Sequence, residues 1–353
     1  MPPHRVSQDD ALQFAKDFFQ YDFPDIDRLL RVFHNAEIES RYFSAPLDWF
    51  KTKHSLKEKN DLYIKFAVEL GVRAIQNCLN GSEYLRKDVA LEDISAVFFV
   101  STTGFSTPSI EAKLMNELPF TPHTKRIPIW GLGCAGGASG LSRAHDYCKA
   151  FPEENVLVVS VELCSLTFQP SDVSKSNLIG TSLFADGAAC VLMAGDESPL
   201  LSQSALASRP SVRGTQSTLM PDSEEVMGWD IRNEGLYVIF SKSIPGIVEK
   251  WLKPNVDEFL FTHDLGRENL SHFVAHPGGK KVLTAYEKSL ELKEGMTDSS
   301  ANILRTYGNM SSPTVLFVLE EHLRKPVPAG DYGLAAALGP GFSSELLLLE
   351  WTS

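Results

Sequence analysis

One cysteine, Cys134, lies at the centre of the glycine-rich stretch GLGCAGGASGL. Apolar residues precede this stretch and a helical pattern follows it, which would place the sulfur in a tight turn at the N-terminus of a helix. Unpaired backbone N–H groups at such a terminus favour the thiolate, the reactive form of cysteine. A buried cysteine in a turn can equally be a small packed hydrophobe. The local sequence leaves both interpretations open.

The cysteine pattern narrows the roles of Cys134. The five cysteines form no CxxC pair and are odd in number, which disfavours a disulfide framework and a zinc site and fits a reducing, cytoplasmic setting. They are Cys78, Cys134, Cys148, Cys164 and Cys190. A packed residue and a nucleophile remain as the two roles of Cys134.

A nucleophilic cysteine needs partners, normally a histidine and a group that orients it or complements charge. His276, in FVAHPGGK, ends an apolar strand and precedes a Pro-Gly-Gly loop, and ligands bind at strand ends in α/β proteins. Asn309, in RTYGNMSS, lies in a loop before an apolar helix, where asparagine also serves as a helix cap. Taken singly, each residue is better explained by structure than by catalysis.

Together, a cysteine, a histidine and an asparagine form the catalytic set of papain-like cysteine proteases. The spacing from Cys134 to His276 falls within the roughly 130–150 residues of that class. The class signature C-G-[SA]-C-[WY] is absent, however, and Cys134 lies in mid-chain. We therefore interpret the spacing as coincidence.

The elements around these residues alternate between strands and helices. Apolar runs at residues 94–101, 155–162 and 188–194 have strand length, and helical patterns at 109–118 and 138–149 lie between the first two. Strands that are apolar throughout are buried on both faces, so helices must cover both sides of the sheet. The pattern predicts an α/β fold.

The second half of the chain repeats this pattern. It shows helical patterns at residues 234–251, 279–292 and 312–323, a short strand at 271–277, and a closing hairpin at 332–341 and 343–351. Residues 202–216 are polar and read as the crossover. We expect two similar halves, residues 1–201 with Cys134 and residues 202–353 with His276 and Asn309.

Composition and charge limit the possible partners. The chain has 353 residues, 43% of them apolar, and no apolar run long enough to cross a bilayer. A net charge of −12 disfavours nucleic-acid binding. A small anionic substrate requires a local cluster of lysines or arginines.

Five motifs, in chain order, resemble those of type III polyketide synthases, the chalcone-synthase-like members of the thiolase superfamily. They are GLGCAGGASGL, SLFADGAA, AHPGG, YGNMSSPTVLFVLE and GPGF. The resemblance is nearest to bacillus-type enzymes that extend fatty acyl-CoA starters to alkylpyrones. It implies a thiolase-like layered αβαβα fold and a homodimer. Fatty-acid condensing enzymes of the β-ketoacyl synthase III type share the Cys-His-Asn set but carry a different tetrapeptide at the histidine, and they are the alternative.

This resemblance implies roles for the three residues. Cys134 carries the acyl group of an acyl-CoA starter, and His276 stabilises its thiolate. His276 and Asn309 then donate hydrogen bonds to the thioester oxygen of malonyl-CoA while CO2 leaves, where preorganised donors stabilise the developing charge. Neither a metal nor a prosthetic group is implied.

The resemblance also implies a set of pocket residues. Phe184 matches a gatekeeping aromatic, whereas Val238 stands where chalcone synthases have a second one, which indicates room for a longer acyl chain. Cys164 lines the cavity, and the loop Gly339-Pro340-Gly341 supports the cyclisation pocket. Ordinary core packing is the alternative for Phe184 and Val238.

Two expectations concern the rest of the chain. Polyanionic CoA needs a basic tunnel mouth, for which Lys280 and Lys281 are candidates, followed by Arg41 and Lys242. Members of the family usually open with a strand before the segment PPHRV, so the N-terminal sheet is expected to be one strand short.

Overall fold

Two four-stranded sheets form the centre of the protein, as seen in a computed structural model that describes residues 1–20, 25–241 and 243–353. In the first sheet, β3 (Ala96–Val100) pairs in parallel with β4 (Lys125–Ile129) and β5 (Asn155–Leu163). β6 (Asp186–Ala194) pairs antiparallel with β5. Every residue of β3 and β5 is buried, which confirms the prediction of strands covered on both faces.

The second sheet repeats part of this arrangement. β10 (Leu270–Ala275) pairs in parallel with β11 (Tyr332–Gly339), and β12 (Ser343–Thr352) is antiparallel to β11. The succession β10–β11–β12 therefore has the same strand directions as β3–β5–β6. β7 (Arg209–Leu219) continues the second sheet on the far side of β12.

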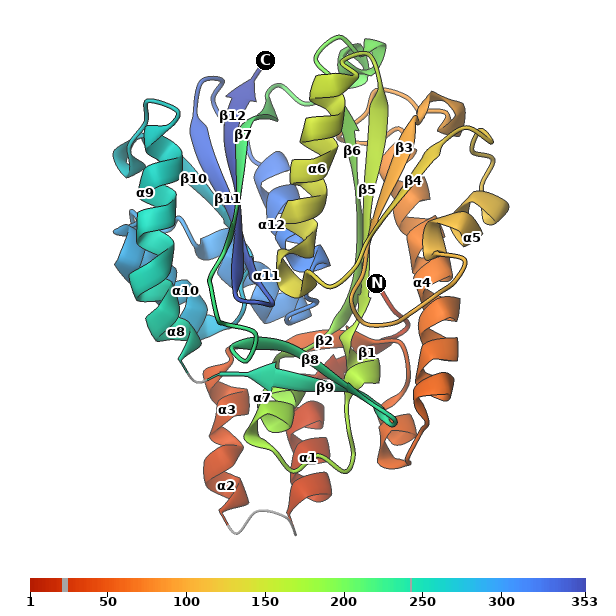
Figure 1. Ribbon diagram of the computed structural model, residues 1–353, viewed down its shortest axis with the longest axis vertical. Helices are drawn as coiled ribbons and strands as arrows, with labels where there is room; N and C mark the ends of the chain where they lie inside the picture. Colours follow the sequence, from red (N-terminus) through yellow and green to blue (C-terminus); the bar gives the residue numbers. More distant parts are fainter. Residues whose placement is uncertain (21–24, 242) are drawn as a thin grey trace.

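Helices fill three layers around the two sheets (Figure 1). α6 (Gly136–Ala150) and α12 (Pro313–Leu323) lie between the sheets and contact both. α4 (Leu56–Leu79) and α5 (Ile110–Glu117) cover the outer face of the first sheet. Residues of α9 (Lys253–Phe261) and α10 (Lys280–Leu290) share a core with the second sheet. The layers run αβαβα, as predicted.

The buried position of α6 depends on its small residues. A Cβ atom at Gly137 would lie 2.2 Å from the carbonyl oxygen of Ser312, and one at Gly140 would lie 2.7 Å from Val158 Cγ1. A larger residue at either position would push α6 away from α12 or from the first sheet.

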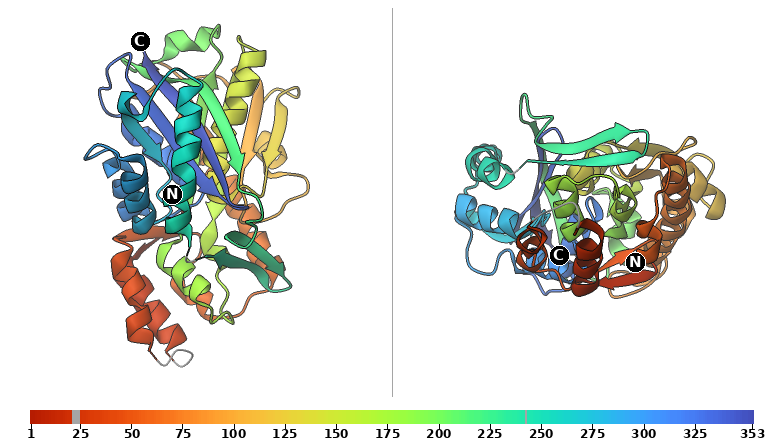
Figure 2. Two further views of the ribbon diagram at one scale, coloured as in Figure 1. Left: turned by 60° about the vertical axis from the view of Figure 1, so that its left-hand side comes forward. Right: turned by 90° about the horizontal axis from the view of Figure 1, so that it is seen from below.

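Smaller elements extend from the lower end of the sheets (Figures 1 and 2). The helix α1 (Gln8–Phe19) begins with a capping box, in which Ser7 and Asp10 bond each other's backbone N–H groups. The other elements here are α2 (Ile26–Leu29), α3 (Arg31–Asn35), β1 (His4–Ser7), β2 (Ser40–Phe43), α7 (Lys175–Leu183), β8 (Met227–Arg232) and β9 (Gly235–Phe240).

Short helical turns complete the described chain. They are Leu47–Lys51, Leu91–Asp93, Gly133–Ala135, Cys164–Thr167, Pro199–Gln203, α8 (Ile244–Ile247), the π-turn Val248–Leu252 and Arg267–Asn269. A longer helix, α11 (Asp298–Tyr307), precedes α12.

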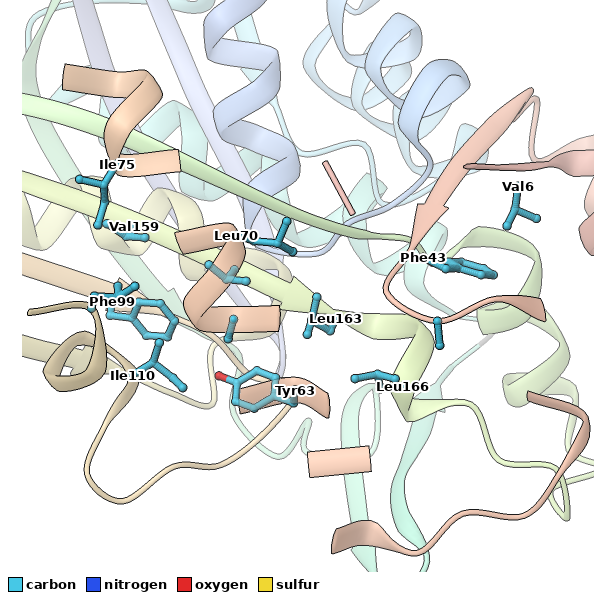
Figure 3. Packing of buried hydrophobic residues seen from close by; sticks show 14 of the residues in the cluster. Val6, Phe43, Tyr63, Leu70, Ile75, Phe99, Ile110, Val159, Leu163 and Leu166 are labelled. Atoms are coloured by element: carbon cyan, nitrogen blue, oxygen red, sulfur yellow. The ribbon is translucent and has the colours of Figure 1, made fainter. Parts of the chain in front are cut away.

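The largest apolar cluster packs α4 against the first sheet and continues toward the lower elements. Figure 3 shows part of it, with Leu70 and Ile75 of α4 beside Val159 and Leu163 of β5. Phe43 of β2 belongs to the same cluster. The lower elements are thus an extension of the N-terminal core.

Two predictions about elements are wrong. Residues 234–251 were expected to be helical, but they begin with the strand β9, which pairs with β8. The apolar run of β9 is continuous, and such a run has no periodicity that distinguishes a strand from a helix. Residues 202–216 are not only a crossover, since β7 starts at Arg209 and pairs with β12. Its polar side chains suit a strand at the edge of a sheet.

The N-terminal segment pairs outside the two large sheets. β1 lies antiparallel to β2, with Val6 opposite Arg41. Among the described residues no strand covers the outer edge of β6, whereas β7 covers the corresponding edge of β12. The first sheet is thus one strand shorter on this side than the second.

Candidate active site

Cys134 lies in the turn Gly133–Ala135, directly before α6, as its sequence context predicts. The backbone of Gly133 adopts a φ of 46°, and a Cβ there would lie 2.8 Å from Pro340 Cδ, so only glycine fits. The cysteine is 8% exposed. It is therefore held in a narrow turn at a helix N-terminus.

His276 follows the last residue of β10, and its backbone N–H donates to the carbonyl of Ala336 at 2.8 Å. The residue is 2% exposed, and neither ring nitrogen has a hydrogen-bond partner among the described residues. Burial lowers the pKa of the imidazole to about 3. Two unpaired nitrogens in a buried position are unusual and fit a site that awaits a ligand.

Asn309 lies in the loop between α11 and α12, where its backbone forms a bridge to residue Phe184. Its N–H donates to the carbonyl of Leu183 at 2.9 Å, and its carbonyl accepts from the N–H of Ala185 at 2.8 Å. The side-chain Nδ2 donates to the carbonyl of Gly278 at 3.3 Å. Asn309 thereby joins the loop that follows His276.

The structure brings the three residues into one site. Burial raises the pKa of the Cys134 thiol to about 11, while side-chain hydrogen bonds with Ser311 and Asn309 act in the opposite direction. Asn309 thus contacts both Cys134 and the loop of His276. The pKa directions favour a neutral thiol and a neutral imidazole at rest, because burial outweighs the hydrogen bonds to Cys134 and acts unopposed on His276.

Glu162, which the sequence did not single out, is a fully buried carboxyl group behind Cys134. Ser312 donates to it at 2.7 Å, Thr103 at 2.8 Å and the N–H of Thr102 at 2.9 Å. Burial raises its pKa to about 7, and these donors oppose the shift. A glutamate at the end of an apolar strand was the available signal, since buried charge is rare without partners.

An apolar pocket opens beside this site. Phe184, Val238 and Cys164 all line it, so the structure brings these three predicted residues together. Sequence reasoning missed the rest of the apolar lining, which comes from α1, β2, the turn Leu47–Lys51 and the residue after the turn Cys164–Thr167. Its apolar members are Ala11, Phe14, Phe43, Leu47, Phe50 and Phe168.

Phe184 and Cys164 connect the pocket with the catalytic candidates. The ring of Phe184 lies 5.8 Å from that of Trp229 and 5.6 Å from that of Phe240, while its backbone bridges to Asn309. Burial raises the pKa of Cys164, and among the smaller contributions is the charge of Cys134. The pocket wall therefore adjoins both Cys134 and Asn309.

The loop Gly339-Pro340-Gly341 lies on the other side of the cysteine turn. A Cβ at Gly339 would lie 2.6 Å from Ala135 Cβ and 2.6 Å from the carbonyl oxygen of Leu132. This close approach makes the loop a support for the Cys134 turn. A part in cyclisation stays a prediction.

The candidate residues for CoA binding differ in exposure and in the groups that they bond. Arg41 is 0% exposed and bonds backbone carbonyls, which contradicts its predicted contact with a phosphate at the tunnel mouth. Lys280 is half-buried and pairs with Glu37 at 3.0 Å, and Lys281 is exposed. Both lysines stay candidates, whereas Lys242 lies outside the described residues.

Metal binding and membrane insertion would each need a recognisable feature of the chain. No group of three or more His, Cys, Asp or Glu side chains among the described residues is arranged to hold a metal ion. No helix within residues 1–20, 25–241 and 243–353 is long and apolar enough to cross a membrane.

Comparison with known protein families shows to which family the chain belongs. Residues 45–197 match the N-terminal domain of the chalcone and stilbene synthases, and residues 211–352 match their C-terminal domain. The chain belongs to this family of type III polyketide synthases. This membership excludes the papain-like interpretation and decides against a β-ketoacyl synthase III.

Individual relatives agree with this assignment. The synthase is 54% identical over 99% of its length to a Bacillus subtilis (strain 168) protein with the provisional name chalcone synthase, of which 96% is covered. It is 35% identical, over 99% of its length and 91% of the relative's, to the 1,3,6,8-tetrahydroxynaphthalene synthase of Streptomyces peucetius subsp. caesius.

A solved structure matches the whole chain. The 1,3,6,8-tetrahydroxynaphthalene synthase of Streptomyces coelicolor A3(2), a bacterial type III polyketide synthase, superposes with a TM-score of 0.91 at 30% identity. The match covers 100% of this synthase and 97% of that chain. The thiolase-like fold and the activity class, an acyltransferase that carries out decarboxylative condensation, follow from these relationships.

Proposed function

We propose that this synthase loads a long-chain fatty acyl-CoA starter onto Cys134 and extends it with malonyl-CoA to alkylpyrone-type products. The observation that carries the proposal is the apolar pocket beside Cys164 and Phe184, because its lining is mostly aliphatic or aromatic, as in sites that bind apolar ligands. An alkyl chain gains free energy from burial in such a lining.

Loading requires that the sulfur of Cys134 attack the thioester carbonyl of the starter. The S–CoA bond breaks, CoA leaves as the thiol, and the proton of the cysteine passes through His276 to the leaving sulfur. The unpaired ring nitrogens of His276 support this role, since a neutral imidazole can accept that proton. The helix terminus at Cys134 stabilises the thiolate that forms transiently.

Extension requires that malonyl-CoA lose CO2 while its thioester oxygen accepts hydrogen bonds from His276 and Asn309. The electron pair of the broken C–C bond becomes a carbanion, which attacks the Cys134 thioester and releases the sulfur. The amide of Asn309 is held in place by its backbone bridge, which supports a preorganised donor. Loss of CO2 drives the step, so we propose that no metal or prosthetic group takes part.

Val238 supports a long starter over a compact aromatic one. It lines the pocket together with Phe184, both side chains lying near Gly180, and it is smaller than an aromatic side chain. We propose that the acyl chain passes Phe184 and Val238 toward the phenylalanines of the N-terminal elements, Phe14, Phe43 and Phe50.

A product profile tests the starter class. The synthase is incubated with malonyl-CoA and acyl-CoAs of graded length, and the products are identified by mass spectrometry. We expect efficient conversion of long chains to pyrones. Formation of 1,3,6,8-tetrahydroxynaphthalene, the compound in the names of two relatives, without conversion of any acyl-CoA would contradict the proposal.

We also propose a cytoplasmic homodimer of two-half subunits divided near residues 201 and 202. β4 lies at the edge of the first sheet, and the adjoining Trp130 is 48% exposed, which supports a subunit contact along this edge. The unpaired cysteines support a reducing compartment. Sedimentation at micromolar concentration tests the dimer, and a monomer would contradict it.

A further inference from the structure

Arg41 is a fully buried arginine with no carboxylate partner among the described residues. Its guanidinium donates instead to the backbone carbonyls of Thr181 at 3.0 Å, Ser182 at 2.6 Å and Phe184 at 3.0 Å. The side-chain oxygen of Gln8 accepts a further hydrogen bond. Burying an unpaired cation is costly, and these neutral acceptors bond both terminal nitrogens, whereas Nε has no hydrogen-bond partner among the described residues.

The three carbonyls belong to the last turn of α7 and the residue that follows it. Carbonyls at a helix C-terminus lack partners within the helix and carry partial negative charge. The fork of donors in arginine can meet several of them at once, which a lysine ammonium does with less directional control. Arg41 therefore sets the position of the α7 terminus.

The α7 terminus in turn holds Asn309. The backbone bridge uses the carbonyl of Leu183 and the N–H of Ala185, which flank Phe184. Arg41 also packs against this bridge, because a Cβ at Gly308 would lie 3.4 Å from Arg41 Cβ. A chain of direct contacts thus runs from the guanidinium to the backbone of Asn309.

We infer that Arg41 is a positioning residue that holds the bridge between Phe184 and Asn309, so that the Asn309 amide points at the malonyl thioester oxygen. The inference rests on the proposed role of Asn309 in extension. Its consequence is selective: displacement of the bridge affects decarboxylation and extension, whereas loading depends on the Cys134 turn, which Arg41 does not contact in the described hydrogen bonds.

The test measures the two half-reactions separately in Arg41→Met and Arg41→Lys. Loading is followed as the mass adduct on Cys134 with an acyl-CoA alone, and extension as CO2 release and product with malonyl-CoA. In Arg41→Met we expect extension to fall roughly 10²-fold, the effect of a misplacement of about 1 Å, with loading within about threefold of the parent. Arg41→Lys should retain charge and show a smaller loss of extension.

Lys59 provides a matched control, since it is also a buried cation held by neutral oxygens, those of Phe168, Gln169 and Glu234. Lys59→Met should lower the melting temperature but leave the ratio of extension to loading unchanged. If Arg41→Met does not fold, Gln8→Leu keeps Arg41 while removing its side-chain acceptor, and it should lower the same ratio.

The outcomes separate this inference from the proposed function. If the Arg41 and Gln8 variants lose loading and extension to the same degree, the inference is overturned. It is also overturned if Lys59→Met changes the ratio of extension to loading as much as Arg41→Met does. In both cases Asn309→Ala still loses extension, so the proposed role of Asn309 is unaffected. If Asn309→Ala itself keeps full extension, the proposed role of Asn309 fails first, and the inference fails with it.

Discussion

The two sides of Cys134 are built differently. On one side lies a polar wall, in which Glu162 accepts hydrogen bonds from Ser312, Thr102 and Thr103. On the other side lies an apolar pocket, to which the N-terminal elements contribute Phe14, Phe43 and Phe50. The polar wall requires complete hydrogen bonding to be stable, whereas the pocket tolerates changes of volume. Chemistry and starter choice should therefore respond to different substitutions.

The largest loss of activity is expected at Cys134, which lies between the polar wall and the apolar pocket. Cys134→Ala should abolish acyl loading and reduce product formation by at least about 10³-fold, because it removes the sulfur that carries the acyl group in both steps. Intact-mass measurement after incubation with an acyl-CoA, together with a product assay, checks this. Cys148→Ala, at a cysteine farther along α6, is the control and should load normally. Full product from Cys134→Ala would sink the assignment of the nucleophile.

A second prediction concerns stability and pH on the polar side. The pKa of Glu162 rises from 4.5 to about 7 on folding, so the folded protein keeps a proton that the unfolded chain releases. The unfolding free energy should therefore fall as pH rises from about 4.5 to 7, and this contribution should be constant above that window. The total change from this group is on the order of 3 kcal/mol.

Glu162→Gln isolates that contribution, because glutamine keeps an acceptor for Thr102 and Thr103 and does not titrate. Urea unfolding at several pH values should show a flatter dependence in the variant than in the parent. Asp186, whose pKa burial raises to about 6, contributes a slope of the same sign in both proteins. Identical slopes in the two proteins would rule out Glu162 as a titrating group.

A third prediction concerns the apolar side. Ala11→Phe should fill part of the pocket and lower kcat/KM for long acyl-CoA starters about tenfold, while short starters change little. Leu12→Phe, on the same helix but not in the pocket lining, is the matched control. Equal losses for long and short starters would show that the pocket does not select chain length.

The smallest effect is expected at the start of α1. Ser7→Ala removes the oxygen that accepts from the N–H of Asp10 and should cost about 1 kcal/mol of stability. Thermal unfolding measures the loss, with the exposed Gln13→Ala as a control. Acyl loading of a short starter should be unaffected, and a matching loss of loading would mean that α1 and the Cys134 turn are coupled.

Much of the fold could be predicted because its signals are local. The apolar runs that became β3, β5 and β6 have strand length, and the small residues after Cys134 indicate a helix that can be buried. β9 was misread because its apolar run has no period of its own, and pairing with β8 decides its state. β8 ends at Arg232, close to β9 in the sequence, but the pairing of the two segments is not encoded in the periodicity of either one.

The sequence by itself determined the fold class, the order of the elements and the three residues of the candidate site, because motifs and periodicity are properties of short segments. Only the tertiary structure decided what Arg41 contacts and which phenylalanines face Cys164 and Phe184. An arginine can bond either a phosphate or backbone carbonyls, and only the placement of α7 against β2 selects between them here.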